Sequence, residues 1–164
     1  MRAALALVAL VGCSAATTSP GIEAGADATS VDAGVDVAGS ACSRDTRAEL
    51  YVAGIEKKAT TLTVKIVSAS PAPPSKETNA WTIEVTDNAT KAAITTAQIT
   101  VTPFMPDHAH GSSHTPKVTE SGAGKYEVND IYYMMPGLWR TTVSVVRQGG
   151  VAAEDGVFNF CVDG

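Results

Sequence analysis

The chain has 164 residues and a formal net charge of −5, with 12 Lys and Arg against 17 Asp and Glu. This length suits one domain with additional segments. Because the charge is mildly acidic and no basic run is present, the sequence argues against a nucleic-acid-binding protein.

Residues 1–12 are typical of an export signal. Arg2 precedes an apolar run over residues 3–11, about half of the length that a bilayer-spanning helix needs. Leu-Val-Gly-Cys at residues 10–13 resembles the bacterial lipobox, whose cysteine is acylated and begins the mature protein. We therefore predict a lipoprotein signal peptide and a lipidated Cys13, and the alternative is a small buried cysteine in an ordinary signal. Ser14 then implies an exported protein anchored in the outer membrane and facing the periplasm.

Residues 14–41 consist largely of Ala, Gly, Ser, Thr and Asp and contain no aromatic or basic residue. Such a segment buries too little apolar surface to offset its ordering entropy. We therefore expect a flexible tether over residues 13–41. It carries four of the 17 acids, which leaves 13 acids against 11 bases in a nearly neutral domain over residues 42–164.

Two cysteines remain beside Cys13, namely Cys42 and Cys161, and they flank the predicted domain. In an oxidising compartment such an even pair predicts a disulfide. A bridge would close a loop of about 120 residues and contribute on the order of 4 to 5 kcal/mol in the chain-entropy model. Two free thiols, or one reactive thiol beside a histidine, are the alternatives.

Periodicity predicts that residues 42–164 form an all-β domain. Short runs rich in Val, Ile and Thr alternate with period two, and Pro, Gly and Asn signals separate them. Six or seven such strands in this length indicate an immunoglobulin-like β-sandwich, with Trp81 and Trp139 in its core. The expected strands are Thr61–Ala69, Trp81–Val85, Ala97–Phe104, a strand containing Tyr126 and Val128, Trp139–Val145, and a last one with Phe158 and Phe160.

All the histidines of the chain lie in one stretch of ten residues, Met-Pro-Asp-His-Ala-His-Gly-Ser-Ser-His, which follows the third expected strand. Its first residue is also one of three methionines besides Met1. Imidazole and thioether are copper ligands, and thioether favours Cu(I) over harder ions. The candidate ligands are His108, His110, His114, Met105, Met134 and Met135.

The loops of a sandwich gather at the two ends of its strands. The loop with the histidines can therefore meet the loop with Met134 and Met135, which precedes the fifth expected strand. In an extended segment His108 and His110 point the same way and can face one ion. Asp107 can orient an imidazole or supply an oxygen ligand. The alternatives are a solvated loop for the histidines and a core position for Met134 and Met135.

Three segments together resemble a known family. They are Met105-Pro-Asp-His-Ala-His-Gly after a Thr-rich strand, Gly124-Lys-Tyr126, and Met135-Pro-Gly-Leu-Trp-Arg-Thr-Thr-Val-Ser-Val145. The chain resembles the YtkA-like or FixH-type domain of bacterial envelope proteins over about residues 60–163, and it is loosely similar to CopC-type copper proteins. This resemblance implies an exported, immunoglobulin-like sandwich of the kind found in copper handling and cytochrome oxidase assembly.

The sequence therefore predicts a lipid-anchored envelope protein that binds copper, in preference to zinc, and captures or delivers it. Its expected partner is a copper-handling or oxidase-assembly protein. The alternative is an interaction or assembly domain of the cell envelope that binds no metal. An enzyme is not expected, because the sequence has no catalytic triad order, paired carboxylates, phosphate loop or His-Glu-x-x-His motif.

Overall fold

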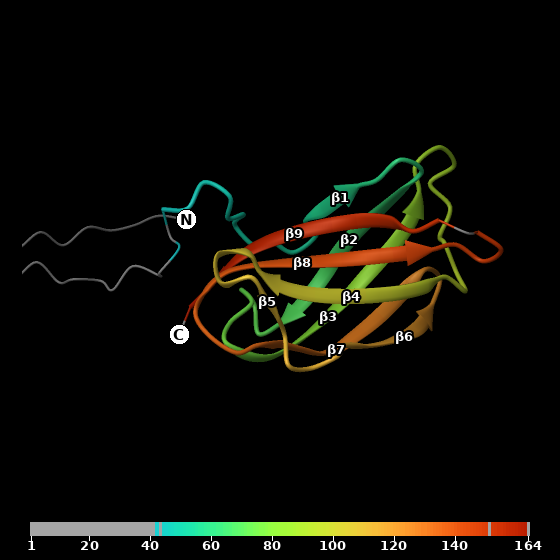
Figure 1. The fold of residues 1–164 in the computed structure, drawn as a ribbon. Coiled ribbons are helices and arrows are strands. Elements are labelled where there is room, and N and C mark those ends of the chain that lie inside the picture. Colours follow the sequence, from blue (N-terminus) through green and yellow to red (C-terminus); the bar gives the residue numbers. More distant parts are fainter. Residues whose placement is uncertain (1–41, 43, 151, 164) are drawn as a thin grey trace, which may run out of the picture. The chain divides into compact units, whose positions relative to one another are not determined.

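The structure is a computed structural model that describes residues 42, 44–150 and 152–163 (Figure 1). The predicted signal peptide, the lipidated Cys13 and the tether lie outside the described residues. Within the described part of the chain, no helix is long and apolar enough to cross a bilayer.

Two antiparallel sheets pack face to face (Figure 1). One sheet has five strands in the order β1-β2-β3-β7-β6, and the other has four in the order β5-β4-β8-β9. The elements are β1 Glu56–Lys58, β2 Leu62–Ser70, β3 Glu77–Asp87, β4 Gln98–Met105, the 3-10 turn η1 Pro106–His108, β5 His110–Gly111, β6 Lys117–Gly122, β7 Lys125–Tyr133, β8 Gly137–Val146 and β9 Glu154–Val162.

The core lies between the sheets because alternate residues of the long strands face inward. In β3 the side chains of Trp81, Ile83 and Val85 are buried, and the residues between them are partly exposed. Trp81 meets Phe158 and Phe160 of the facing sheet edge-on, with ring centroids 5.9 Å apart in both pairs. The predicted all-β sandwich is confirmed.

The six expected strands are present, but the prediction missed three further ones. β1 has three residues and β5 has two, which is too short for a periodic signal. β6 is exposed along nearly its whole length, so its sequence, Lys-Val-Thr-Glu-Ser-Gly, has no apolar face. Within β4, Val101 is buried whereas Ile99 is only partly buried.

The antiparallel registers place the loops at two ends of the sandwich. At one end, β4 runs into η1, β8 begins, and Gly137 of β8 pairs with Val162 at the end of β9. We call this the histidine end. At the opposite end β8 finishes, and Val145 pairs with Glu154 at the start of β9.

Candidate metal centre

The histidine stretch folds as a tight reversal of the chain. η1 follows β4 directly, Ala109 adopts a left-handed conformation with φ 53°, and β5 returns along β4 with His110 opposite Met105. The prediction that His108 and His110 lie in an extended segment is therefore wrong. The reversal itself brings the two side chains together.

The imidazoles of His108 and His110 form a pair, with ring centroids 5.8 Å apart and planes at 62°. Since metal–nitrogen bonds are about 2 Å long, this separation is of the size that a shared ion requires. The Nδ1 atom of His110 lies 3.0 Å from the Gly111 carbonyl oxygen. Because a carbonyl only accepts, this contact places a hydrogen on Nδ1, and the neutral imidazole then has its lone pair on Nε2, where a metal can bind.

Met105 lies beside this pair. Directly opposed residues of an antiparallel pair share a face with Cβ atoms about 4.5 to 5.5 Å apart, so the Met105 and His110 side chains are neighbours. Met105 is only 2% exposed and packs over Gly137, where a Cβ atom would clash with its terminal methyl group. The thioether is thus held between the histidine turn and the start of β8.

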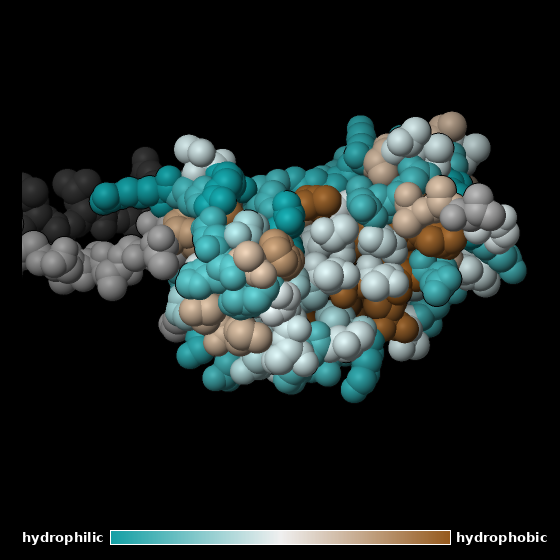
Figure 2. All heavy atoms as spheres, in the orientation of Figure 1, coloured by the Kyte–Doolittle hydropathy of each residue, from teal (hydrophilic) through white to brown (hydrophobic). Residues whose placement is uncertain are grey.

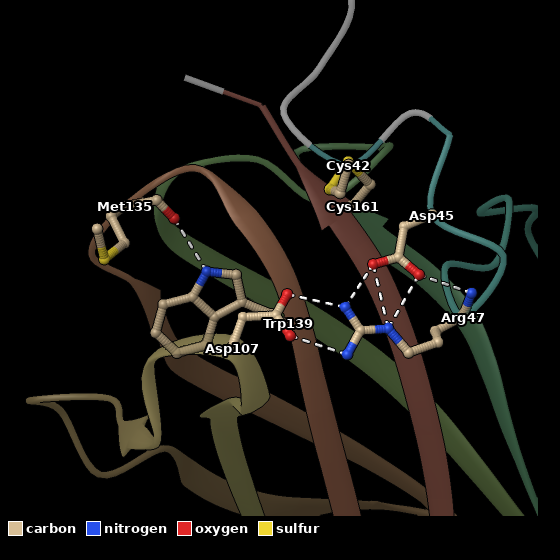
Figure 3. Close-up of a disulfide and its surroundings, with 7 residues drawn as sticks. All are labelled: Cys42, Asp45, Arg47, Asp107, Met135, Trp139 and Cys161. Carbon is tan, nitrogen blue, oxygen red and sulfur yellow. Dashed lines mark hydrogen bonds and ion pairs between the residues drawn. A yellow bond between two sulfur atoms is a disulfide. The ribbon is translucent and has the colours of Figure 1, made fainter.

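Trp139 joins the two predicted ligand loops. Its ring is fully buried and lies edge-on to His110, with centroids 5.8 Å apart. Its indole Nε1 donates a 2.9 Å hydrogen bond to the Met135 carbonyl oxygen, as Figure 3 shows. Met134 and Met135 are partly buried and pack against the core. The histidine and methionine loops therefore meet at one end of the sandwich.

His114 turns away from the pair toward the other sheet. Its Nδ1 lies 2.8 Å from Asp130 Oδ1, and its ring stacks on Tyr132 of β7 with centroids 4.2 Å apart. The hydrogen bond from His114 lowers the pKa of the Asp130 carboxyl. Among residues 42, 44–150 and 152–163, no three His, Cys, Asp or Glu side chains are grouped around one metal position.

In the described part of the chain, Asp107 makes no hydrogen bond to an imidazole. Both of its carboxylate oxygens accept 2.8 Å hydrogen bonds from the Arg47 guanidinium, and Arg47 also binds Asp45 (Figure 3). These bonds from Arg47 lower the pKa of the Asp107 carboxyl. Sequence reasoning missed Arg47, because it lies 60 residues from Asp107 and no local pattern connects them.

The predicted disulfide between Cys42 and Cys161 is present, with Cα atoms 5.5 Å apart and a sequence separation of 119. It lies at the histidine end near Asp45 and Arg47 (Figure 3). The same bridge therefore joins the start of the described domain to the last strand.

Comparison with known families decides the relationship. The model of the YtkA-like family matches residues 56–144, more than half of the chain. The protein belongs to the YtkA-like family. The match covers β1 to most of β8 and includes the histidine stretch, so the resemblance in the sequence is confirmed, although the matched range stops before β9.

Solved structures with a similar fold include three structures of two bacterial proteins. A copper-bound variant of FetP from uropathogenic Escherichia coli strain F11 has 12% identity and a TM-score of 0.48, over 68% of this chain and 96% of that one. The same FetP in its as-isolated form, produced recombinantly in the periplasm of E. coli, has 13% identity and a TM-score of 0.47, over 69% of this chain and 96% of that one. A DUF4426 family protein from Pseudomonas aeruginosa PAO1 has 12% identity and a TM-score of 0.47, over 66% and 96%. No curated protein matches the sequence.

Proposed function

We propose that this protein binds copper at the histidine end of its sandwich and captures or delivers the ion in the cell envelope. The observation that carries the proposal is the pairing of His108 and His110 with Met105 opposite His110 in the β4–β5 register. In this proposal these three side chains are the ligands. Met134 and Met135, partly buried in the adjacent loop, are available to an arriving or leaving ion.

The donor set favours copper over zinc. Zinc sites in proteins use thiolate, imidazole and carboxylate ligands, whereas a thioether selects a softer ion such as Cu(I). The nearest carboxylate in the sequence, Asp107, is held by Arg47. Two imidazoles and a thioether therefore suit copper, and copper is cargo in this proposal.

The protein acts in this proposal as a carrier and not as an enzyme. Asp107 is next to His108 in the sequence, and its carboxylate is bound by Arg47. Asp130 contacts His114, and its carboxylate is bonded to that imidazole. Neither is left to act as a general base. The signal and lipobox support attachment by Cys13 to the outer membrane, facing the periplasm, and the family resemblance supports a copper-handling or oxidase-assembly partner.

Metal titration of the exported chain carrying Cys13→Ala tests the proposal. We expect a dissociation constant well below 10 micromolar for Cu(II), or for Cu(I) kept reduced by ascorbate. A dissociation constant of about 10 micromolar, which is a binding free energy of roughly −7 kcal/mol, is the weakest that a carrier would use. The double variant His108→Ala with His110→Ala should bind at least about 100-fold more weakly. Wild-type protein that binds neither ion more tightly than this limit would refute the proposal.

Tryptophan fluorescence locates the ion independently. Because Trp139 lies against His110, bound Cu(II) should quench its emission. The matched variants are Trp81→Phe, which keeps the quenched residue, and Trp139→Phe, which removes it. Equal quenching in the two variants would place the ion elsewhere.

One observation favours the second candidate, an interaction domain that binds no metal. Among the described residues, Leu50 and Val52 are the large hydrophobic side chains that are exposed, at 89% and 58%, and they lie two positions apart in the chain. Figure 2 shows only small, separated hydrophobic groups on the pictured face of the described domain. The protein would have this function instead if it bound no copper in the titration, and if the double variant Leu50→Ser with Val52→Ser lost binding to a protein partner.

A further inference from the structure

We infer that Arg47 determines both the geometry and the ion preference of the copper site, as a positioning residue that acts through Asp107. The inference rests on the proposed function. Arg47 belongs to a segment formed by Cys42 and residues 44–49, which we call the strap.

Arg47 holds two carboxylates at once (Figure 3). Its Nη1 and Nη2 donate to the two oxygens of Asp107 at 2.8 Å, and its Nε and Nη2 donate to Asp45 at 3.0 and 2.6 Å. Two forked, charge-assisted contacts on one planar guanidinium define the orientation of both carboxylates, and a lysine cannot reproduce them.

Apart from the β4–β5 pairing that closes it, the turn that carries Asp107 has few other restraints. None of the three residues of η1 is buried, and Met105 at its N-cap makes no side-chain capping bond. The internal bond from the Ala109 N–H to the Pro106 carbonyl is 3.3 Å long. Since His108 follows Asp107 directly, the two bonds from Arg47 set the position of His108 relative to His110.

The strap in turn is fixed to β9 at both of its ends. Cys42 is bonded to Cys161, and the Glu49 N–H donates a 2.7 Å bond to the Asn159 carbonyl. Between them, the Asp45 N–H donates to the Cys42 carbonyl at 2.9 Å. Arg47 therefore transmits the position of β9 to the histidine turn.

Arg47 also removes a competing ligand. A free Asp107 carboxylate next to His108 would add a hard oxygen donor to the site, and oxygen donors favour Zn(II) and other harder ions over Cu(I). With both oxygens bound to Arg47, the site presents imidazole and thioether alone. Loss of Arg47 should then change which ion is bound as well as how tightly.

The test compares Cu(I) and Zn(II) affinities in the full chain with Cys13→Ala. We expect Arg47→Ala to weaken Cu(I) binding about tenfold and to shift the Zn(II)-to-Cu(I) affinity ratio toward zinc by a larger factor. Arg47→Lys should resemble Arg47→Ala. Adding Asp107→Ala to Arg47→Ala should reverse the gain for zinc, because no carboxylate is then available.

Arg44→Ala is the matched control, since Arg44 is an exposed arginine of the same strap. It should leave both affinities unchanged. If Arg47 had a purely structural role, its loss would weaken the binding of both ions equally. An unchanged Zn(II)-to-Cu(I) affinity ratio in Arg47→Ala would therefore overturn the inference. Copper binding by the wild-type protein would still support the proposed function in that case.

A metal-free measurement separates the two hypotheses. The imidazole NMR signals of His108 should broaden in metal-free Arg47→Ala, whose melting temperature verifies that the variant is folded. Wild-type protein that binds no copper refutes the proposed function. Imidazole signals unaltered by Arg47→Ala would refute the positioning role whether or not copper binds.

Discussion

At each end of the sandwich an arginine side chain bonds two separate segments, but the two ends differ in the metal-ligand side chains that remain available. At the opposite end, Arg147 bonds Asp87 at 2.9 Å and the Thr61 carbonyl at 2.8 Å, while Glu154 accepts from the Thr61 N–H at 2.6 Å. At the histidine end, Arg47 similarly joins two segments. An arginine that spans two loops is therefore a closing device at both ends of this fold.

The histidine end carries metal-ligand atoms beyond those that its closing contacts use. Among the described residues of the opposite end, Arg147 is bonded to Asp87 and Thr61, and Glu154 to Thr61, so these carboxylates already have partners. The histidine end adds two imidazoles, one with its Nε2 lone pair free, and a thioether beside them. Metal binding in this fold therefore depends on side chains that the contacts closing the end of the sandwich do not use.

The largest expected effect comes from removing the disulfide at the histidine end. Cys42→Ser with Cys161→Ser should lower the free energy of unfolding by about 4 kcal/mol, since the bridge closes a loop of more than 100 residues. Urea denaturation measures it. Reduction of wild-type protein should reproduce the loss, and an unchanged midpoint would mean that the strap is held by its other bonds alone.

Gly137→Ala should destabilise the histidine end by disturbing its buried packing. The added methyl group would clash with Met105, and the φ of 137° is unfavourable for alanine, so we expect a loss of about 2 to 4 kcal/mol. Copper affinity should fall as well, because Met105 must shift. Gly149→Ala, with positive φ but open space around it, is the control for backbone strain alone.

Arg147→Ala tests whether the two ends of the sandwich act independently. Three bonds to Asp87 and Thr61 are lost, and hydrogen bonds of charged groups contribute about 1.5 to 3 kcal/mol each at most, less where partly exposed. We expect thermal unfolding to show a loss of about 1 to 2 kcal/mol, with copper affinity unchanged. A weakened copper site would show that the two ends are coupled through the sheets.

The smallest effect is a pH dependence of stability. Bonds from the Thr90 backbone and hydroxyl, and the ion pair with Arg147, lower the pKa of Asp87 to about 2. A carboxyl with a lowered folded-state pKa stabilises the fold above its unfolded pKa of about 4. That contribution is lost as pH falls from about 4 to 2.

Asp87→Asn should therefore flatten the acid limb of a plot of melting temperature against pH. Asp45, whose pKa is lowered to about 2 mainly by the Arg47 side chain, provides the same test at the histidine end through Asp45→Asn. An acid limb that neither variant alters would assign the pH dependence to other carboxylates.

Local sequence determined the long strands and the family. Alternation of apolar residues is a property of neighbours in the chain, so β2, β3 and β8 were predictable, as was the pairing of two cysteines that flank the domain. The clustering of the histidines is a property of the sequence itself. Because a sandwich has two ends, proximity of the histidines to Met134 and Met135 was one of two possibilities, and the sequence did not choose between them.

Tertiary structure alone decided how those ligands are arranged. The reversal at Ala109 is stabilised by pairing of His110 with Met105, and no local pattern distinguishes it from an extended segment. His114 turned to Asp130 because the chain there crosses to the other sheet. Arg47 found Asp107 across 60 residues, and only the folded positions of β4 and β9 bring such distant charges together.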